Sequence, residues 1–422
     1  MKIVHAADLH LDSPLRAVRP PAPLQQIRLA TRHALANLVD LCIAEHAALL
    51  LLAGDLYDGD WRDYSTGLYF AHQMGRLREA GVQVVMIRGN HDAASQITKS
   101  LHLPDNVREL SPRRPESVYF ESLGVVVHGQ SFANRAVTEN LAEHYPAREP
   151  SLLNIGLLHT SITGRTGHEP YAPCTLDDLR SMGYDYWALG HVHTREIVHR
   201  EPWVVFPGNL QGRHARETGE KGAMLIEYEA AGIASVEPRA LDVVRYAQCA
   251  LDLSGVRNFD EGLDRLRPVL ERELERADGR VLGVRVELVG HTPLHARLLA
   301  NDDFLGNVQA LAQDVSSDEL WIEKLQVHTS SEAQAHAAGV DQDALSELLS
   351  AIAAQRDDPA LLAELSAGLE ELRSKLPAEV REGAEGLHVD EPGFLALQLN
   401  AALQLLEARL SESPLPSETS RT

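Results

Sequence analysis

Side chains able to bind metal ions and transfer protons directly follow a short apolar run in this sequence. Gly89-Asn90-His91-Asp92 comes after Val84-Val85-Met86-Ile87-Arg88, a β-branched stretch that predicts a buried strand. In an open α/β sheet, ligands bind just beyond the carboxyl ends of the strands. Because Gly-Asn also forms ordinary turns, this stretch predicts a functional site only if other strand ends repeat the pattern.

Other predicted strand ends do repeat it. A single histidine at a strand end is more often an ordinary surface or core residue, but here carboxylates and imidazoles follow strand after strand. Two of the ends carry doublets two residues apart, and in an extended segment such residues point to the same side. The set is Asp8, His10, Asp55, Asn90, His91, His159, His191 and His193.

The residue types indicate metal-dependent phosphoryl chemistry. Oxygen and imidazole ligands without thiolate suit Mn²⁺, Fe or Zn²⁺, and this many ligands would serve two ions, which is the arrangement of many phosphodiester-cleaving sites. Asp55 is the candidate to bridge them. His91, next to the neutral oxygen donor Asn90, need not bind metal and could protonate a leaving oxygen as a general acid. Asp92 has two open interpretations: it orients His91, or it caps the following helix.

The elements that must position these residues predict an α/β fold. Apolar runs at 3–7, 49–53 and 84–87 alternate with helical patterns near 24–41 and 66–80, which favours right-handed crossovers and a parallel core. Later runs, from 125 to 228, have fewer helices between them, so that part of the sheet structure is expected to be antiparallel or mixed. We expect two stacked sheets flanked by helices, a four-layer α/β/β/α sandwich.

The remaining chain predicts two further parts. Residues 241–330 read as a small α+β domain, in which His291 and His295 are taken as surface residues. Residues 331–422 read as a helical segment with a disordered end, following the first domain at 1–240. Leucines near 345–352 and 399–410 form amphipathic faces, which either pack on the body of the protein or dock a partner helix.

Charge and composition limit the function classes. The chain of 422 residues has 61 acidic and 39 basic side chains, a net charge of −22, which argues against a free-standing nucleic-acid binder with a basic face. Half of the excess lies in 331–422, with 17 acidic and 6 basic residues. No apolar run approaches the roughly 18 residues of a membrane span. The three scattered cysteines form no disulfide framework, so a cytoplasmic protein is expected.

The motifs together resemble a known superfamily. Asp8-x-His10, Gly54-Asp55, Gly89-Asn90-His91-Asp92, His159 and Gly190-His191-x-His193 look like the motifs of the calcineurin-like metallophosphoesterases, in the same order, over about the first 240 residues. The stretch Gly54-Asp55-Leu56-Tyr57-Asp58 and the appended α+β domain resemble the SbcD-type DNA repair nucleases, and among them the YhaO-like bacterial exonucleases. The stretches 207–214 and 216–219 support that branch.

This resemblance carries detailed expectations. One ion would be held by Asp8, His10, Asp55 and His193, and the other by Asp55, Asn90, His159 and His191, with His91 as the catalytic histidine. The enzyme would be a two-metal phosphodiesterase, with Mn²⁺ expected and Fe or Zn²⁺ as alternatives, acting on DNA as a repair exonuclease. The small domain would cap the nuclease and contact DNA, the C-terminal helices would dock onto an SbcC-like coiled-coil ATPase, and the chain would form a homodimer.

Several alternatives stay open. Arg88, Arg213 and Arg216 are candidates for contacting substrate phosphates, or they are ordinary surface charges. Instead of a nuclease, the chain could be a small-molecule phosphodiesterase or a phosphatase, although Gly59-Asp60 stands where related phosphatases carry an arginine. It could also be a docking subunit with weak activity, although the complete ligand set argues against an idle site.

Overall fold

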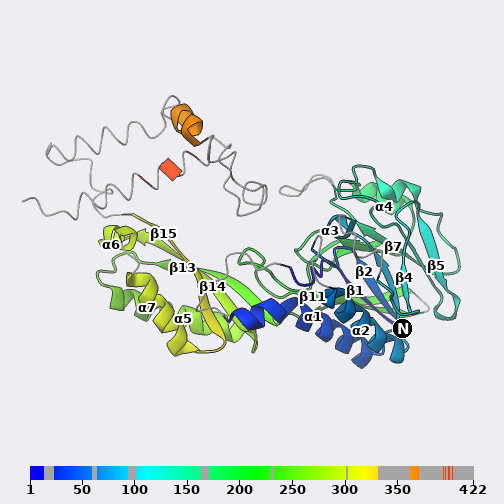
Figure 1. Cartoon of the computed structure of the whole chain (residues 1–422), viewed down its shortest axis with the longest axis horizontal. Coiled ribbons are helices and arrows are strands. Elements are labelled where there is room, and N and C mark those ends of the chain that lie inside the picture. The colour runs from blue at the N-terminus through cyan, green and yellow to red at the C-terminus, as the bar shows by residue number, and fades with distance from the viewer. Residues whose placement is uncertain are drawn as a thin grey trace, which may run out of the picture. The chain divides into compact units, whose positions relative to one another are not determined.

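The computed structural model describes most of the chain before residue 331. The described residues are 1–13, 23–58, 64–93, 101–162, 171–229, 232–300, 303–330 and 362–369, with 393, 395, 398, 399 and 402. They divide into two compact units (Figure 1). The first unit is Met1–Gln248 with Glu271–Arg285 and Ser316–Glu323, and the second is Cys249–Leu270, Val286–Val315 and Lys324–Thr422.

The first sheet contains the strands that open the chain. Its order is β12-β11-β1-β2-β3-β4. Strands β1 to β4 are parallel, β11 pairs antiparallel with β1, and β12 pairs antiparallel with β11. The helices α1 (Leu24–Ala44) and α2 (Ser65–Glu79) form the crossovers. The strands are β1 (Lys2–Ala6), β2 (Leu49–Ala53), β3 (Gln83–Ile87), β4 (Val107–Glu109), β11 (Gly222–Glu229) and β12 (Gly232–Ala240).

The second sheet is mixed, as the sequence predicts. Its order is β5-β6-β7-β8-β10-β9, with parallel central strands and an antiparallel strand at each edge. Short helices accompany it: η2 (Glu121–Leu123), η3 (Leu141–His144) and α4 (Leu176–Ser181). The strands are β5 (Glu116–Phe120), β6 (Val125–Gly129), β7 (Leu153–His159), β8 (Tyr186–Gly190), β9 (Glu196–Arg200) and β10 (Trp203–Phe206).

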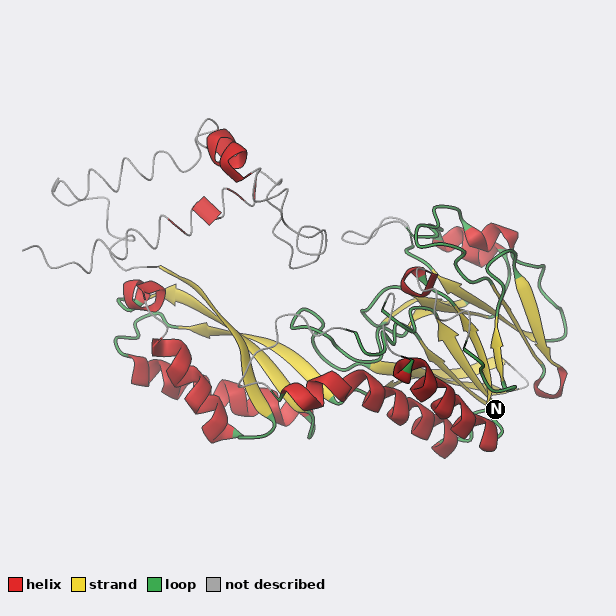
Figure 2. Cartoon of the chain, viewed as in Figure 1, coloured by secondary structure: helices red, strands yellow, loops and turns green. Residues whose placement is uncertain are grey.

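Alternation of side chains along the strands builds the layers. In β2, Leu50 and Leu52 face the helices α1 and α2, whereas Leu49 and Leu51 face the second sheet. The outer face of the second sheet packs against α4 and η3 around Trp187, and Figure 2 shows helices on both outer faces. Because both faces of each sheet are covered, the strands read as continuous apolar runs. The α/β/β/α sandwich is confirmed.

A buried histidine connects the two sheets. His5 of β1 is fully buried; its Nε2 donates to the carbonyl of Leu189 at 3.1 Å, so Nδ1 accepts from the hydroxyl of Tyr186 at 3.0 Å. This pairing requires the neutral ring. Burial accordingly lowers the pKa of His5 to about 3, although its hydrogen bond to Leu189 opposes that shift.

The third sheet lies in the region expected to be α+β. Its order is β13-β14-β15, and the boundary between the two units passes through its strands. In the second unit, Phe259 packs on Phe304. His295 is buried, with Nδ1 2.9 Å from the Thr329 hydroxyl, so its prediction as a surface residue was wrong. The elements are β13 (Val244–Asp252), α5 (Phe259–Ala277), β14 (Val281–His291), α6 (His295–Ala300), α7 (Asp303–Val315) and β15 (Leu320–Ser330).

Later parts of the chain are described only in short pieces. Residues 362–369 are helical, and the leucines predicted to form amphipathic faces lie, apart from Leu399, outside the described residues. Among the described helices, none has the length and apolarity needed to cross a membrane. Within the described residues, Cys42, Cys174 and Cys249 form no disulfide bond.

Candidate metal centre

The predicted ligands gather at the carboxyl ends of five strands. Asp8 and His10 follow β1, Asp55 follows β2, and Asn90 begins the short helix α3 (Asn90–Ala93) after β3. His159 ends β7, and His191 and His193 follow β8. Three overlapping groups have ligand atoms within 4.8 Å of one another: Asp8, His10 and His193; His10, Asp55 and His91; Asp55, His159 and His191.

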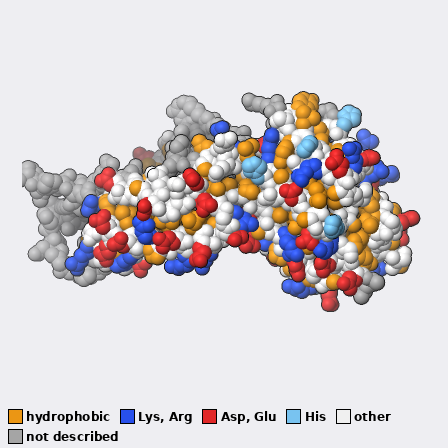
Figure 3. All heavy atoms as spheres, turned by 90° about the horizontal axis from the view of Figure 1, so that it is seen from below, with side chains coloured by type: hydrophobic (Ala, Val, Ile, Leu, Met, Phe, Trp, Pro, Cys, Tyr) orange, Lys and Arg blue, Asp and Glu red, His pale blue; other side chains and the backbone are white. Residues whose placement is uncertain are grey.

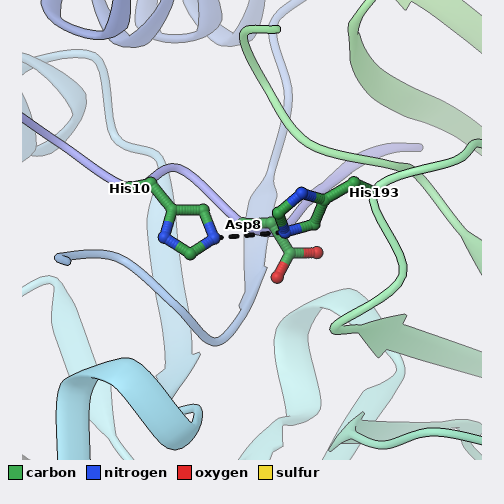
Figure 4. Close-up of side chains that lie close together, drawn as sticks. All are labelled: Asp8, His10 and His193. Atoms are coloured by element: carbon green, nitrogen blue, oxygen red, sulfur yellow. Dashed lines mark hydrogen bonds between the residues drawn. The ribbon is translucent and has the colours of Figure 1, made fainter. Parts of the chain in front are cut away.

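The first group converges from the ends of β1 and β8. His10 and His193 point toward each other, with their Nε2 atoms 3.2 Å apart and Asp8 beside them (Figure 4). Asp8 is buried and accepts the backbone N–H of His191 at 3.0 and 3.1 Å. Burial raises the pKa of this carboxyl to about 6, with Asp55 adding to the shift and nearby histidines opposing it. A bound cation would relieve this cost of a buried negative charge.

The third group, Asp55, His159 and His191, surrounds Asp55. The fully buried His159 donates from Nδ1 to the carbonyl of Ala53 at 2.9 Å, while its Nε2 lies 2.9 Å from Asn90 Oδ1 and 3.4 Å from Asp55 Oδ2. Burial favours a neutral ring, but Asp55 outweighs it and raises the pKa of His159 to about 9. Conversely, burial opposes ionisation of Asp55, yet His159 and its other histidine neighbours hold the pKa of that carboxyl well below its usual range.

The backbone that presents these ligands is not extended. Asp8, His10 and Asp55 have φ angles of 52°, 42° and 52°, and His191 has 99°, a region that non-glycine residues seldom adopt. Hydrogen bonds from Asp8 N to Gly54 O and from His10 N to Asp55 O, both 3.0 Å, tie the two loops together. The expectation of an extended Asp-x-His segment was therefore wrong: a strained loop gathers the ligands, as is common at functional sites.

His91 lies beside the ligands with its own carboxylate partner. Its Nδ1 is 2.7 Å from Asp58 Oδ1, and Asp58 also accepts the hydroxyl of Ser13 at 2.6 Å. Burial lowers the pKa of His91, but the hydrogen bond to Asp58 and the nearby charge of Asp55 outweigh it, so the pKa is raised overall. The His91 side chain remains 32% exposed, which leaves the ring accessible to a substrate.

Asp92 has a different role from that of orienting His91. Its buried carboxylate accepts the backbone N–H groups of Leu56 at 3.1 Å and Tyr57 at 2.9 Å, which follow Asp55. It also accepts the N–H of Gly89 at 3.0 Å, just before α3. Among the described residues, these bonds are neither to His91 nor to a backbone N–H group that follows Asp92, so neither of the two open interpretations describes them. The same side chain fastens the loop after β2 to the turn after β3.

The three candidate arginines have different surroundings. Arg88 forms an ion pair with Glu109. Arg213 Nη1 lies 3.4 Å from both Asp58 Oδ2 and Ser13 Oγ, so its guanidinium is directed at the carboxylate that supports His91. Arg216 is exposed. A role of any of them in substrate binding stays a prediction.

Sequence reasoning overlooked two carboxylates that support the site. Asp58 lies in the quoted stretch after Asp55, three positions on, and pairs with His91. Glu217 lies in the stretch 216–219 and approaches His193 Nδ1 to 2.5 Å. The only sequence signal was their place in stretches that resemble family motifs, because loop residues follow no periodic pattern.

The donor set fits two divalent cations. It combines carboxylate, amide and imidazole groups without thiolate. Five of its seven members are buried, namely Asp8, His10, Asp55, Asn90 and His159, and His191 and His193 are half-buried. Burial of this many ionisable groups at one sheet edge destabilises the fold unless bound ions or other charges compensate them. The roles of individual ligands are taken up as a proposal below.

Comparisons with known proteins agree with this chemistry. Residues 1–195 match the family "Calcineurin-like phosphoesterase", and residues 246–330 match "Metallophosphoesterase YhaO, middle domain". The metallophosphoesterase YhaO of Bacillus subtilis is 34% identical over 350 residues, which cover 81% of this chain and 84% of that protein.

More distant similarities extend to proteins named for DNA repair. The DNA double-strand break repair protein Mre11 of Sulfurisphaera tokodaii is 26% identical (52% of this chain, 59% of that protein), and that of Methanopyrus kandleri is 29% identical (56% of each). The chain thus spans somewhat more than half the length of these two relatives.

Two solved structures also resemble the chain. They are TT1561 of Thermus thermophilus (15% identity, 57% of this chain and 98% of that one, TM-score 0.33) and a dimetal phosphatase from Danio rerio (12%, 54% and 92%, 0.36). The identity to YhaO extends over most of both chains, and the phosphoesterase family match covers the strand ends that carry the ligands from Asp8 to His193. This chain therefore belongs to the calcineurin-like metallophosphoesterases of the YhaO type and is a metal-dependent phosphoester hydrolase.

Proposed function

We propose that the chain hydrolyses phosphodiester bonds of DNA at a two-metal centre. The observation that carries the proposal is the convergence of ligand side chains from five strand ends beside His91, which has its own carboxylate partner. One ion would be held by Asp8, His10, Asp55 and His193, and the other by Asp55, Asn90, His159 and His191. Bound divalent cations would supply activation of water and neutralisation of phosphoryl oxygens.

His91 is the proposed general acid. Asp58 holds Nδ1, which leaves Nε2 to face the substrate. As the oxygen of water bonds to phosphorus, the bond from phosphorus to the leaving oxygen breaks, and the leaving oxygen takes the proton from Nε2. The ring then becomes neutral and keeps its Nδ1 proton toward Asp58, while the proton lost by the water passes to solvent. Asp58 thereby stabilises the charged ring before proton transfer.

DNA as the substrate is supported by the similarity to proteins named Mre11. The surface itself gives less guidance: on the face drawn in Figure 3, Lys and Arg side chains are interspersed with Asp and Glu. Arg88, Arg213 and Arg216 are proposed as contacts to phosphates. Because the chain is acidic overall, much of the attraction for a polyanion would have to come from the bound cations.

The finer assignments belong to the same proposal. Mn²⁺ is the proposed physiological ion, with Fe or Zn²⁺ as alternatives, and the enzyme would be a cytoplasmic DNA repair exonuclease. Residues 1–240 would form the nuclease domain and 241–330 the capping domain, which the family matches to 1–195 and 246–330 support. Residues 331–422 would dock onto an SbcC-like ATPase, and the chain would dimerise.

The test is cleavage of end-labelled duplex and single-stranded DNA in the presence of Mn²⁺. We expect wild type to cut and His91→Ala to retain both ions but to cut at least about 100-fold more slowly, the usual contribution of a general acid. A panel of cyclic nucleotides and phosphoproteins runs in parallel. Turnover of those substrates but not of DNA would replace this proposal with a small-molecule or phosphoprotein hydrolase.

A further inference from the structure

Two histidines of the proposed centre differ in how the ring nitrogen Nδ1 is held. His159 donates from Nδ1 to a backbone carbonyl, that of Ala53. His193 instead has the carboxylate Oε1 of Glu217 2.5 Å from its Nδ1. A carboxylate can only accept, so Nδ1 carries the hydrogen and Nε2 keeps its lone pair toward His10 and Asp8.

Glu217 is itself fixed from the other side. Its Oε2 accepts Asn209 Nδ2 at 3.0 Å and the backbone N–H of Arg213 at 2.7 Å. The Glu217 side chain is only 8% exposed and Asn209 is fully buried. A glutamate with both oxygens engaged and little solvent contact cannot reorient freely, so the position of the His193 ring is determined by the loop that follows β10.

The same loop also forms hydrogen bonds to the backbone carbonyls of two ligand residues. Asn209 N donates to His193 O and Leu210 N to Asp8 O, each at 3.4 Å, and the Lys221 ammonium donates to His193 O at 2.9 Å. At Gly208, with φ 79°, an added Cβ would lie 2.9 Å from His193 O. Residues 207–221 therefore contact both chain segments of the first ligand group, at Asp8 and at His193.

We propose that Glu217 is a positioning residue for one metal ion only, the ion bound by Asp8, His10, Asp55 and His193, and that it sets the affinity difference between the two ions. The inference rests on the proposed two-metal function. A carboxylate behind a ligating imidazole fixes its tautomer and makes it a stronger donor, and loss of such a partner typically costs about 10- to 100-fold in metal affinity. The ion bound through His159, with a carbonyl behind it, should not respond.

The test titrates Mn²⁺ into metal-stripped protein by calorimetry and counts bound ions by elemental analysis. We expect Glu217→Gln, which keeps an acceptor but removes the charge, to weaken one of two ions about 10-fold, and Glu217→Ala, which removes both, to weaken the same ion about 100-fold. Glu220→Gln is the matched control, because Glu220 lies in the same loop with a 58% exposed side chain and should bind both ions like wild type.

Two outcomes overturn the inference. Unchanged affinities for both ions in Glu217→Ala would show that the contact does not matter. An equal loss at both ions, together with a lower melting temperature of the metal-free protein, would make Glu217 a general support of the loop. If Glu217→Ala does not fold, Glu217→Asp, which keeps the charge but is one methylene shorter, must still weaken one ion selectively. Because no DNA is used, failure of wild type to cut DNA would refute the proposed function without affecting this result.

Discussion

Gly89→Ala adds one methyl group and should disable the metal centre, although the substitution replaces none of the ligands. A Cβ at this position would lie 2.2 Å from Asp55 Oδ1 and 2.8 Å from Asp55 N, whereas ordinary contact begins at 3.4 Å. Either Asp55 or the turn after β3 must move by about 1 Å, several times the roughly 0.2 Å tolerance of metal–ligand distances. Overpacking of this kind also costs about 1–3 kcal/mol of stability.

Because Asp55 belongs to two of the three ligand groups, both ions should be affected. We expect Gly89→Ala to bind each Mn²⁺ at least about 10-fold more weakly in a calorimetric titration. Gly75→Ala is the control: Gly75 lies within α2, nothing would come within 4 Å of its Cβ, and alanine should stabilise the helix by about 0.5–1 kcal/mol. Wild-type affinity for both ions in Gly89→Ala would refute the view that close packing of this turn fixes Asp55.

Three further predictions follow from the same geometry. Asp58→Asn should slow DNA cleavage about 10- to 100-fold, as expected for loss of a charged hydrogen bond worth about 1.5–3 kcal/mol, and should leave the metal content unchanged. The control is Asp40→Asn, which changes an exposed ion pair with Arg76 and should not change the rate. Equal rates in the two variants would exclude the role of Asp58. Removal of ions with EDTA should abolish cleavage, and Mn²⁺ at about 100 times its Kd should restore about 2.7 kcal/mol of stability in thermal melts; identical melting curves with and without ions would contradict this. The pKa of His5 is lowered from 6.5 to about 3, so the ring stays neutral in the folded protein but takes up a proton in the unfolded chain below about pH 6.5. The free energy of unfolding should therefore fall by about 1.4 kcal/mol for each pH unit below that value. Urea titrations between pH 6.5 and 5 should show that this dependence on pH is smaller by about one proton in His5→Gln than in wild type, and an unchanged dependence would mean that His5 is protonated in the fold.

The sequence predicts which strand ends form the site because two simple patterns coincide. Apolar runs identify buried strands, and the carboxyl ends of parallel strands meet at one edge. Asp8, Asp55 and His159 each follow or end such a run and lie together in the structure. The sandwich could be predicted for the same reason, since strands covered on both faces read as continuous apolar segments.

The parts that escape prediction are those determined by loops. Asp8 and His10 reach the site through positive φ angles, and neither residue type nor spacing indicates that conformation. The partnerships of Asp58 with His91 and of Glu217 with His193 join residues 33 and 24 positions apart, which only the folded chain reveals. His295 shows the reverse error: a polar residue after a proline reads as exposed, yet Thr329 provides it with a buried hydrogen-bond partner.

The charge of the site explains how so acidic a chain could act on a polyanion. Asp8, Asp55, Asp58 and Glu217 supply carboxylates to one small region, and Arg213, 3.4 Å from Asp58 and 3.9 Å from Glu217, is the arginine seen to contact two of them. Two divalent cations would add four positive charges to this region and favour an anionic phosphate, so at this site binding of the substrate and the chemistry would depend on the same ions. The carboxylates are then a requirement for holding those ions, and the acidity of the chain is compatible with a phosphodiesterase.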